Sequence, residues 1–274
     1  MIPAAFDYAR ATSVDEALSL LAEHGDEAKL LAGGHSLLPL MKLRLAQPSV
    51  LIDVGRLDEL KGIRDDGDQI VIGALTRHHD VEHSELLKAQ VAILPEATGH
   101  VGDSQVRHRG TIGGSLAHAD PASDLPAVVL ALGGSLVARS AARGERTIPA
   151  ADFFTGFLES ALEPDELLTE VRVPKGPEAG HAFVKFNRRA QDWAIVGVAA
   201  VRNGTTGVGL VNMGSTPLRA TAVEAALASG ASAADAAERA AEGAEPQADL
   251  NASVEYRTHL VKVLVRRALE AAGA

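Results

Sequence analysis

Two short glycine-rich segments, Ala32–Ser36 and Thr111–Ser115, have residue types suited to holding an anion. The first reads Ala-Gly-Gly-His-Ser and the second reads Thr-Ile-Gly-Gly-Ser. Paired glycines let another group approach the backbone closely, and a helix that starts at such a segment offers free N–H groups and the positive end of its dipole. One such segment alone is most simply a tight turn. Two in one chain can clamp a diphosphate from two sides.

The residues around these segments exclude two common kinds of phosphate-binding site and favour a ligand with hydroxyl groups. Neither segment is followed by Gly-Lys-Ser/Thr, so neither is a P-loop, and neither has the Gly-x-Gly-x-x-Gly of a nicotinamide site. Asp124 follows the second segment, where its carboxylate could accept hydrogen bonds from sugar or ribityl hydroxyls. Gly207-Val208-Gly209 with Gly214 resembles the nicotinamide pattern weakly and is interpreted as strand and turn, because no suitable helix start follows.

Other reactive residue types are scattered. His78-His79 and His118 with Asp120 are two separate pairs, so we expect no metal site. His35 is a possible base, but its place in the first segment favours phosphate contact or packing. Trp193, the single tryptophan, has two equally supported interpretations: it lies beside a bound ring system, or it caps the C-terminal core.

The elements expected around the first segment form a small parallel sheet. Ser13 and Glu16 make a capping box for a helix, and Ala28–Leu31 and Val50–Val54 are apolar runs of strand length. Ser36 is expected to cap a helix with Pro39 in its first turn. Strands that alternate with helices indicate parallel pairing.

The pattern changes after this region. Gly62–Gly73 predicts a hairpin around Asp65-Asp66-Gly67-Asp68, Val81–Thr98 predicts a helix, and Leu132–Val173 contains short strands and turns. Lys175–Gly180 is the best boundary between two domains. Three strand-like runs and a final helix follow: His181–Phe186, Ala194–Val201, Gly207–Met213 and Val254–Ala272. The alanine-rich stretch Ala231–Pro246 is either a linker or exposed helices, and the high helix propensity of alanine favours helices.

Composition excludes several classes of protein. With 46% hydrophobic residues the chain is not disordered, and a net charge of −10 argues against nucleic-acid binding. The absence of cysteine rules out disulfides and cysteine-held zinc or iron–sulfur clusters within this chain. No apolar run reaches membrane-spanning length, and the first residues lack the pattern of a signal peptide. We therefore expect a cytoplasmic protein.

The two segments stand within longer motifs, AGGHSLLPLMKLRLA and RGTIGGSLAHADPASD, which resemble the FAD-binding medium subunit of molybdenum hydroxylases, of the aerobic carbon monoxide dehydrogenase type. The resemblance covers essentially the whole chain. It also includes LIDV at Leu51–Val54, IGALT at Ile72–Thr76, KFNRRAQDWAIVGVAA at Lys185–Ala200 and GSTPLRA at Gly214–Ala220.

The resemblance implies an α+β fold of the vanillyl-alcohol-oxidase/PCMH type in three parts. These are an N-terminal α/β FAD-binding subdomain at 1–56, a middle α+β FAD-binding subdomain at 57–176, and a C-terminal domain at 177–274. The last would be a three-stranded antiparallel sheet with helices that closes over the flavin.

The residues implied to bind FAD follow from the same motifs. They are Ala32, Gly33, Gly34, His35 and Ser36 of the first segment, Thr111, Ile112, Gly113, Gly114 and Ser115 of the second, the acidic position Asp124, and the basic position Lys185 near the isoalloxazine. His108 departs from the usual Arg-Asn-Arg-Gly-Thr of the family, which affects local packing outside the glycines. No residue is expected to be catalytic in its own right.

The implied function is electron transfer within a complex. Relatives accept electrons from iron–sulfur clusters of a small partner subunit, which serves a large molybdenum-cofactor subunit, and pass them to an external acceptor. A dimer of heterotrimers is expected, in the cytoplasm or held at the inner face of the membrane through the complex. Carbon monoxide is the first candidate substrate, with purines, nicotinate-like heterocycles and aldehydes as alternatives. The acceptor is open among quinone, nicotinamide, oxygen and a carrier protein.

Two other functions remain open at this point. A free-standing FAD-dependent oxidase or reductase would need an acid or base over the flavin, for which only His35, His118 and Asp192 are candidates. A non-catalytic nucleotide-binding scaffold would bind no flavin. The absorbance spectrum and the co-purifying subunits distinguish the three.

Overall fold

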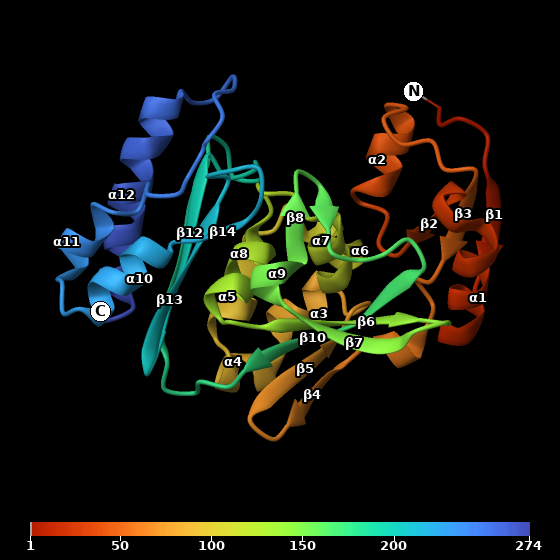
Figure 1. Ribbon diagram of the computed structural model, residues 1–274, viewed down its shortest axis with the longest axis horizontal. Helices are drawn as coiled ribbons and strands as arrows, with labels where there is room; N and C mark the ends of the chain where they lie inside the picture. Colours follow the sequence, from red (N-terminus) through yellow and green to blue (C-terminus); the bar gives the residue numbers. More distant parts are fainter. Residues whose placement is uncertain (1) are drawn as a thin grey trace.

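Three main sheets, each with its own helices, follow one another along the chain (Figure 1). The computed structural model describes residues 2–274. The first sheet has the order β1-β3-β2, from β1 (Asp7–Arg10), β3 (Val50–Asp53) and β2 (Ala28–Leu31), and all pairs are parallel. The predicted small parallel sheet is therefore confirmed.

Helix α1 (Val14–His24) packs on this sheet through buried Leu18 and Leu21. The Ser13 hydroxyl accepts a hydrogen bond from the Glu16 backbone N–H at 3.1 Å, as a capping box requires. The reciprocal half differs from prediction, because the Glu16 carboxylate accepts from the backbone and hydroxyl of Thr12. A 3-10 turn (Gly25–Glu27) leads from α1 into β2.

The middle sheet is antiparallel and has the order β4-β5-β10-β6-β7. Its strands are β4 (Ile63–Asp66), β5 (Gln69–Gly73), β10 (Glu166–Pro174), β6 (Ser135–Ser140) and β7 (Gly144–Pro149). The predicted hairpin is the pair β4–β5. A 3-10 turn (Asp58–Leu60) precedes it, and a separate small hairpin, β8 (Phe154–Gly156) with β9 (Glu159–Ser160), follows helix α9 (Ala150–Phe153).

The single helix predicted over Val81–Thr98 is wrong. The structure has three short helices there: α3 (His78–His83), α4 (Glu85–Gln90) and α5 (Ile93–Gly99). Ser84 is extended and its hydroxyl caps α4 at the Leu87 N–H, so the chain restarts a helix instead of continuing one. Helices α6 (Ser104–Arg109), α7 (Ile112–His118) and α8 (Asp124–Ala131) complete this part.

The C-terminal sheet contains the three predicted strands and one short addition. Its order is β11-β12-β13-β14, from β11 (Gly180–Phe186), β12 (Val196–Asn203), β13 (Thr205–Val211) and the two-residue β14 (Leu218–Arg219), all antiparallel. Helices α10 (Thr221–Ala228), α11 (Ala233–Ala237) and α12 (Val254–Ala271) lie beside it (Figure 1). No helix within residues 2–274 is long and apolar enough to cross a bilayer.

The expectation of exposed helices in the alanine-rich stretch Ala231–Pro246 is wrong. The stretch forms only one short helix, α11, followed by turns, and Ala236, Ala237 and Ala240 are buried, not exposed. These small side chains pack in the same apolar cluster as α12. Close packing of these small side chains therefore stabilises the helix, in addition to the helix propensity of alanine.

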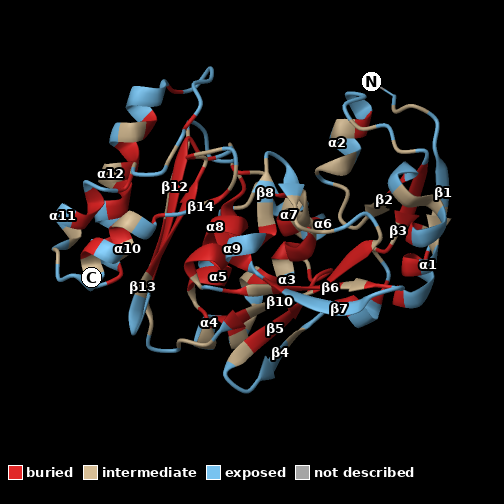
Figure 2. Cartoon of the chain, viewed as in Figure 1, coloured by how far each residue is buried: buried red, intermediate tan, exposed pale blue. Residues whose placement is uncertain are grey.

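Helix α8 is the centre of the molecule, and all eight of its residues are buried (Figure 2). Two glycines of β13 lie directly against its backbone. A Cβ atom at Gly207 or Gly209 would lie 2.0 Å from the carbonyl oxygen of Ala131 or Ala127, respectively. At these two positions no side chain separates the strand from the helix.

The predicted α+β class is confirmed by this mixture of sheets and helices. The last strand of the first sheet ends at Asp53, and the middle sheet spans Ile63–Pro174. The C-terminal sheet begins at Gly180. The division at residues 56 and 176 stays a prediction.

Candidate functional site

A cavity of about 770 Å³ lies between all three parts of the chain. This volume is within the range of about 300–1,000 Å³ that is common for small-molecule and cofactor sites. Both glycine-rich segments, the first residue of α8, Lys185 of β11 and the segment Gln191–Trp193 contribute to its wall. The hairpin β8–β9 contributes from another side.

The first glycine-rich segment connects β2 to α2 (Leu37–Lys42). Gly34 has a φ of +80°, which side chains rarely allow, so the turn requires glycine there. The predicted capping role of Ser36 is not observed. Ser36 has helical backbone angles, not the extended ones of a capping residue, and its side chain makes no capping hydrogen bond. Its hydroxyl is therefore available to a ligand.

The second segment is built differently, because its glycines lie inside the first turn of α7. The Thr111 hydroxyl caps this helix by accepting from the Gly114 N–H at 3.1 Å. Gly113 packs on the preceding chain, where a Cβ would lie 2.5 Å from Ala74 Cβ and 2.6 Å from its carbonyl oxygen. Ile112 is fully buried and is the only proposed site residue that does not line the cavity.

The first segment packs against the backbone just before the second segment. A Cβ at Gly33 would lie 2.4 Å from the carbonyl oxygen of Arg109 and 2.8 Å from the Cα of Gly110. A Cβ at Gly114 would lie 4.0 Å from Ala32 Cβ. Positions about 80 residues apart in sequence thus form one continuous wall, with backbone groups in place of side chains.

Asp124 and Lys185 form a buried ion pair at the cavity. Lys185 Nζ lies 2.7 Å from Asp124 Oδ2 and also donates to the carbonyl oxygen of His100 at 2.9 Å. The two side chains are only 6% and 5% exposed. Burial raises the pKa of Asp124 to about 6, while Lys185 acts in the opposite direction.

The second carboxylate oxygen of Asp124, Oδ1, is buried and has no hydrogen-bond partner. Buried polar atoms are almost always hydrogen-bonded in folded proteins. Asp124 belongs to the cavity wall, so a small shift of its carboxylate would bring Oδ1 within reach of a donor on a bound molecule. A hydroxyl group satisfies it best.

The histidines and the tryptophan occupy different environments. His35 and His118 line the cavity. His78 also lines it but is 3% exposed, and burial, followed by the charge of Arg107, lowers its pKa to about 4. Trp193 is 60% exposed and lines the cavity, so it does not cap the C-terminal core.

Residues that the sequence did not suggest also line the cavity. Thr155, Leu158 and Glu159 come from the β8–β9 hairpin, and Val101, Gly102 and Val106 come from the loop before α6 and from α6 itself. No motif marks them in the sequence. The one structural sign is Leu158, a non-glycine residue with a φ of +58° at the hairpin tip.

Comparison with known proteins covers nearly the whole chain. Residues 4–176 match the FAD binding domain in molybdopterin dehydrogenase, and residues 181–272 match the CO dehydrogenase flavoprotein C-terminal domain. The carbon monoxide dehydrogenase medium chain of Hydrogenophaga pseudoflava is 42% identical over 285 residues, covering 100% of this chain and 99% of the relative. The caffeine dehydrogenase subunit beta of Pseudomonas sp. is 40% identical and covers 82% of this chain and 78% of the relative.

Solved structures of related proteins have the same fold over the whole chain. A chain of a carbon monoxide dehydrogenase from Hydrogenophaga pseudoflava superimposes with a TM-score of 0.95 at 44% identity, covering 100% of this chain and 99% of the other. A chain of quinoline 2-oxidoreductase from Pseudomonas putida 86 gives 0.91 at 34% identity, with coverages of 100% and 99%.

Proposed function

The chain belongs to the FAD-binding medium subunits of the molybdenum hydroxylases, and we propose that it holds FAD in the cavity between its two glycine-rich segments, Asp124 and Lys185. It is the flavoprotein subunit of a molybdenum-containing oxidoreductase and has an electron-transfer role. The observation that carries the proposed site is one cavity wall that holds both glycine-rich segments, with Gly33 packed on the backbone just before the second segment, together with Asp124 and its unpartnered Oδ1.

The residues present fit such a cofactor. The missing Cβ atoms at Gly33 and Gly113 let the cavity wall pack closely on Arg109 and Ala74, and both glycines present backbone in place of side chains to a diphosphate. Asp124 Oδ1 needs a donor, which a ribityl or ribose hydroxyl provides. Backbone N–H groups also matter because the chain has a net charge of −10 and gives a diphosphate little general attraction.

When bound, FAD supplies the redox chemistry, because its ring system can carry one or two electrons. The chain's own residues bind and orient it. The ammonium of Lys185 has three donors, of which one is given to Asp124 and one to His100, so the third is available to the cofactor. Its positive charge favours any negative charge that develops nearby.

We expect two partner subunits, one with iron–sulfur clusters and one with the molybdenum cofactor, in a dimer of heterotrimers. The absence of cysteine in this chain means that a cluster must come from another chain. Carbon monoxide is the first candidate substrate because two carbon monoxide dehydrogenase medium chains match the whole chain, at 42% and 39% identity. The cytoplasmic location stays a sequence-based prediction.

The test is anaerobic reduction of the bound flavin, followed by its absorbance. The isolated chain should bind FAD, with no covalent link, yet show no bleaching with carbon monoxide, a purine or an aldehyde. Adding the two partner subunits should produce bleaching with one of these substrates and so identify it.

Rapid bleaching of the isolated chain by any of these substrates would contradict the electron-transfer role and favour a free-standing flavoenzyme. Yellow colour that stays with the denatured polypeptide would contradict noncovalent binding. A chain that takes up no FAD would favour the nucleotide-binding scaffold.

A further inference from the structure

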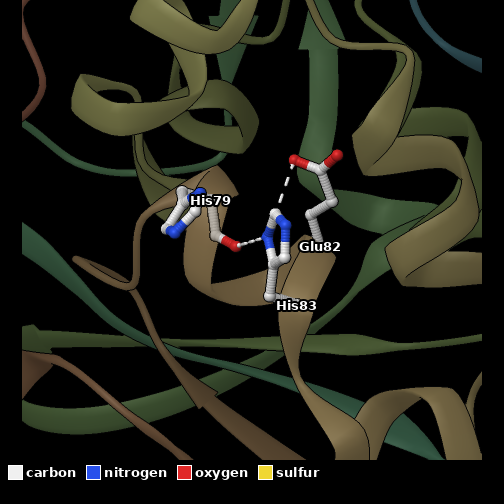
Figure 3. Close-up of side chains that lie close together, drawn as sticks. All are labelled: His79, Glu82 and His83. Atoms are coloured by element: carbon white, nitrogen blue, oxygen red, sulfur yellow. Dashed lines mark hydrogen bonds and ion pairs between the residues drawn. The ribbon is translucent and has the colours of Figure 1, made fainter.

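Two histidines and a glutamate gather on one face of α3, outside the cavity wall (Figure 3). They are His79, Glu82 and His83, and one nitrogen or oxygen atom from each lies within 4.8 Å of the others. Spacings of three and four residues place side chains on the same face of a helix. His78, the neighbour of His79, turns into the core instead.

A third imidazole comes from the adjacent helix α6. The rings of His79 and His108 are stacked with their centroids 4.1 Å apart, and those of His79 and His83 lie 4.3 Å apart. Three imidazoles at this spacing would repel one another if protonated. In neutral form they place several nitrogen lone pairs in a small volume.

Hydrogen bonds fix which nitrogen of two rings carries the proton. His83 Nδ1 lies 2.8 Å from the carbonyl oxygen of His79, and His108 Nδ1 lies 2.6 Å from that of Ser104. A carbonyl oxygen only accepts, so each Nδ1 must donate, and in the neutral ring Nε2 keeps its lone pair. Metal-binding histidines characteristically donate their other N–H in this way.

Glu82 retains a free oxygen for a ligand. Its Oε2 accepts from Arg107 Nε at 2.7 Å, and Oε1 accepts no hydrogen bond within residues 2–274. Oε2 is also the oxygen that faces His83, 3.9 Å from its Nδ1, so the free Oε1 reaches the histidines once the carboxylate turns about its last side-chain bond (Figure 3). The carboxylate also supplies negative charge in a region where Arg107 is positive.

We propose that His79, Glu82 and His83 bind one divalent first-row transition metal ion, with the fourth position open to water or to His108. Imidazole with carboxylate suits zinc, copper and nickel, whereas calcium and magnesium prefer oxygen alone. Ligand atoms around tetrahedral zinc lie about 3.4 Å apart, given bonds of about 2.1 Å. Small side-chain rotations from the present 4.8 Å limit reach that arrangement. The proposal is independent of the cofactor site.

The experiment is calorimetric titration of the full-length, tag-free, FAD-loaded chain with zinc chloride. One ion per chain should bind, and His79→Gln and His83→Gln should each weaken binding by at least about tenfold, in the range seen when a supporting ligand contact is lost. His259→Gln is the matched control, because His259 is exposed on α12 away from this cluster, and its affinity should equal that of the unaltered chain.

A second readout identifies the ligands directly. Copper(II) titrated into the same chain should show nitrogen hyperfine splitting in its electron paramagnetic resonance spectrum, and the splitting should simplify in His83→Gln. Circular dichroism and FAD content establish that each variant is folded. Failure of zinc to bind at one site, or equal affinity in folded His79→Gln, His83→Gln and His259→Gln, would overturn the proposal.

Discussion

Lys185 on β11 and Asp124 at the start of α8 form an ion pair of 2.7 Å that joins the C-terminal sheet to the middle part of the chain. Both side chains are almost completely buried. A buried pair of this kind contributes little net stability compared with an apolar pair, but losing one partner leaves an isolated buried charge.

Lys185→Met should lower the free energy of unfolding of the apo chain by about 3 kcal/mol, because Asp124 is left without its partner. The double variant with Asp124→Asn should recover part of this loss. Urea unfolding measures both. Lys88→Met, which removes an exposed pair with Glu85, is the control and should change stability by less than about 0.5 kcal/mol. Equal effects of the two lysine substitutions would contradict the prediction.

FAD affinity should rise with pH up to about 6 and then level off. Burial raises the pKa of Asp124 from 3.8 to about 6 in the apo chain, and a hydroxyl donated to Oδ1 favours the charged form, so binding FAD releases a proton. Because burial raises the pKa of Asp124 in the folded apo chain above its unfolded value of 3.8, its protonation contributes stability at low pH. That contribution is complete below about 4 and is lost as pH rises to about 6. Flavin fluorescence titrations measure the affinity. Asp124→Asn should bind FAD without this pH dependence, and an unchanged profile would exclude Asp124 as its source.

Gly33→Ala should weaken FAD binding and destabilise the chain together. The added Cβ would meet the backbone of Arg109 at 2.4 Å, and backbone cannot move aside as a side chain can. The two segments must then separate, at a cost of about 1–3 kcal/mol, typical for overpacking. FAD content after purification and urea unfolding measure the two effects. Gly67→Ala is the control. Its Cβ would meet nothing within 4 Å, so the variant adds only the backbone strain of a φ of +69° and no collision. It should keep its FAD.

Gly114→Asp should remove FAD without unfolding the chain. A Cβ there meets the Thr111 hydroxyl at 2.7 Å, and turning that hydroxyl away gives up its cap on the Gly114 N–H at a cost of about 1 kcal/mol, while the new carboxylate would repel a diphosphate. Two unit charges 4 Å apart repel by about 4 kcal/mol at an effective dielectric constant of 20, so binding should weaken by at least about 100-fold. Gly113→Ala is the contrasting variant: it meets Ala74 in the core and should lower stability first. Full flavin occupancy in Gly114→Asp would exclude the second segment from the site.

The fluorescence of Trp193 should report cofactor binding. It is the single tryptophan, it lines the cavity, and it is 60% exposed. Adding FAD to the apo chain should quench its emission by energy transfer to the ring system. FMN should quench it as well, whereas ADP should not if Trp193 lies near the ring end. Unchanged emission at full FAD occupancy would place the flavin away from Trp193.

The helices and strands that are specified by neighbouring residues, such as an apolar run or a turn sequence, were predictable. β2 has the predicted bounds Ala28–Leu31, and the β4–β5 hairpin follows its turn residues. The break between α3 and α4 was missed although Ser84-Glu85 is a recognisable helix start, because the apolar spacing alone suggested one helix. Burial of the alanines in α11 depends on α12, which lies about 20 residues further along the chain.

The site was predictable only in part. Glycine pairs indicate places where backbone approaches something closely, but the partner of Gly33 is Arg109, which no local pattern connects to it. Asp124 and Lys185 are 61 residues apart, and their pairing needs the tertiary fold; the second glycine segment pointed to Asp124, whereas Lys185 was suggested only through the family resemblance. The hairpin residues Thr155 and Leu158 belong to no recognisable motif, so the sequence does not indicate that they line the cavity.

The contact between α8 and β13 has a consequence for motion. Since Gly207 and Gly209 bring strand and helix backbones together, the C-terminal part cannot rock on the rest without breaking that seam. A cofactor in the cavity beside the Asp124–Lys185 pair would then enter and leave past side chains at the rim, on a timescale set by local fluctuations and not by domain opening. The depth of that cofactor below the outer surface of this chain is accordingly set when the chain folds.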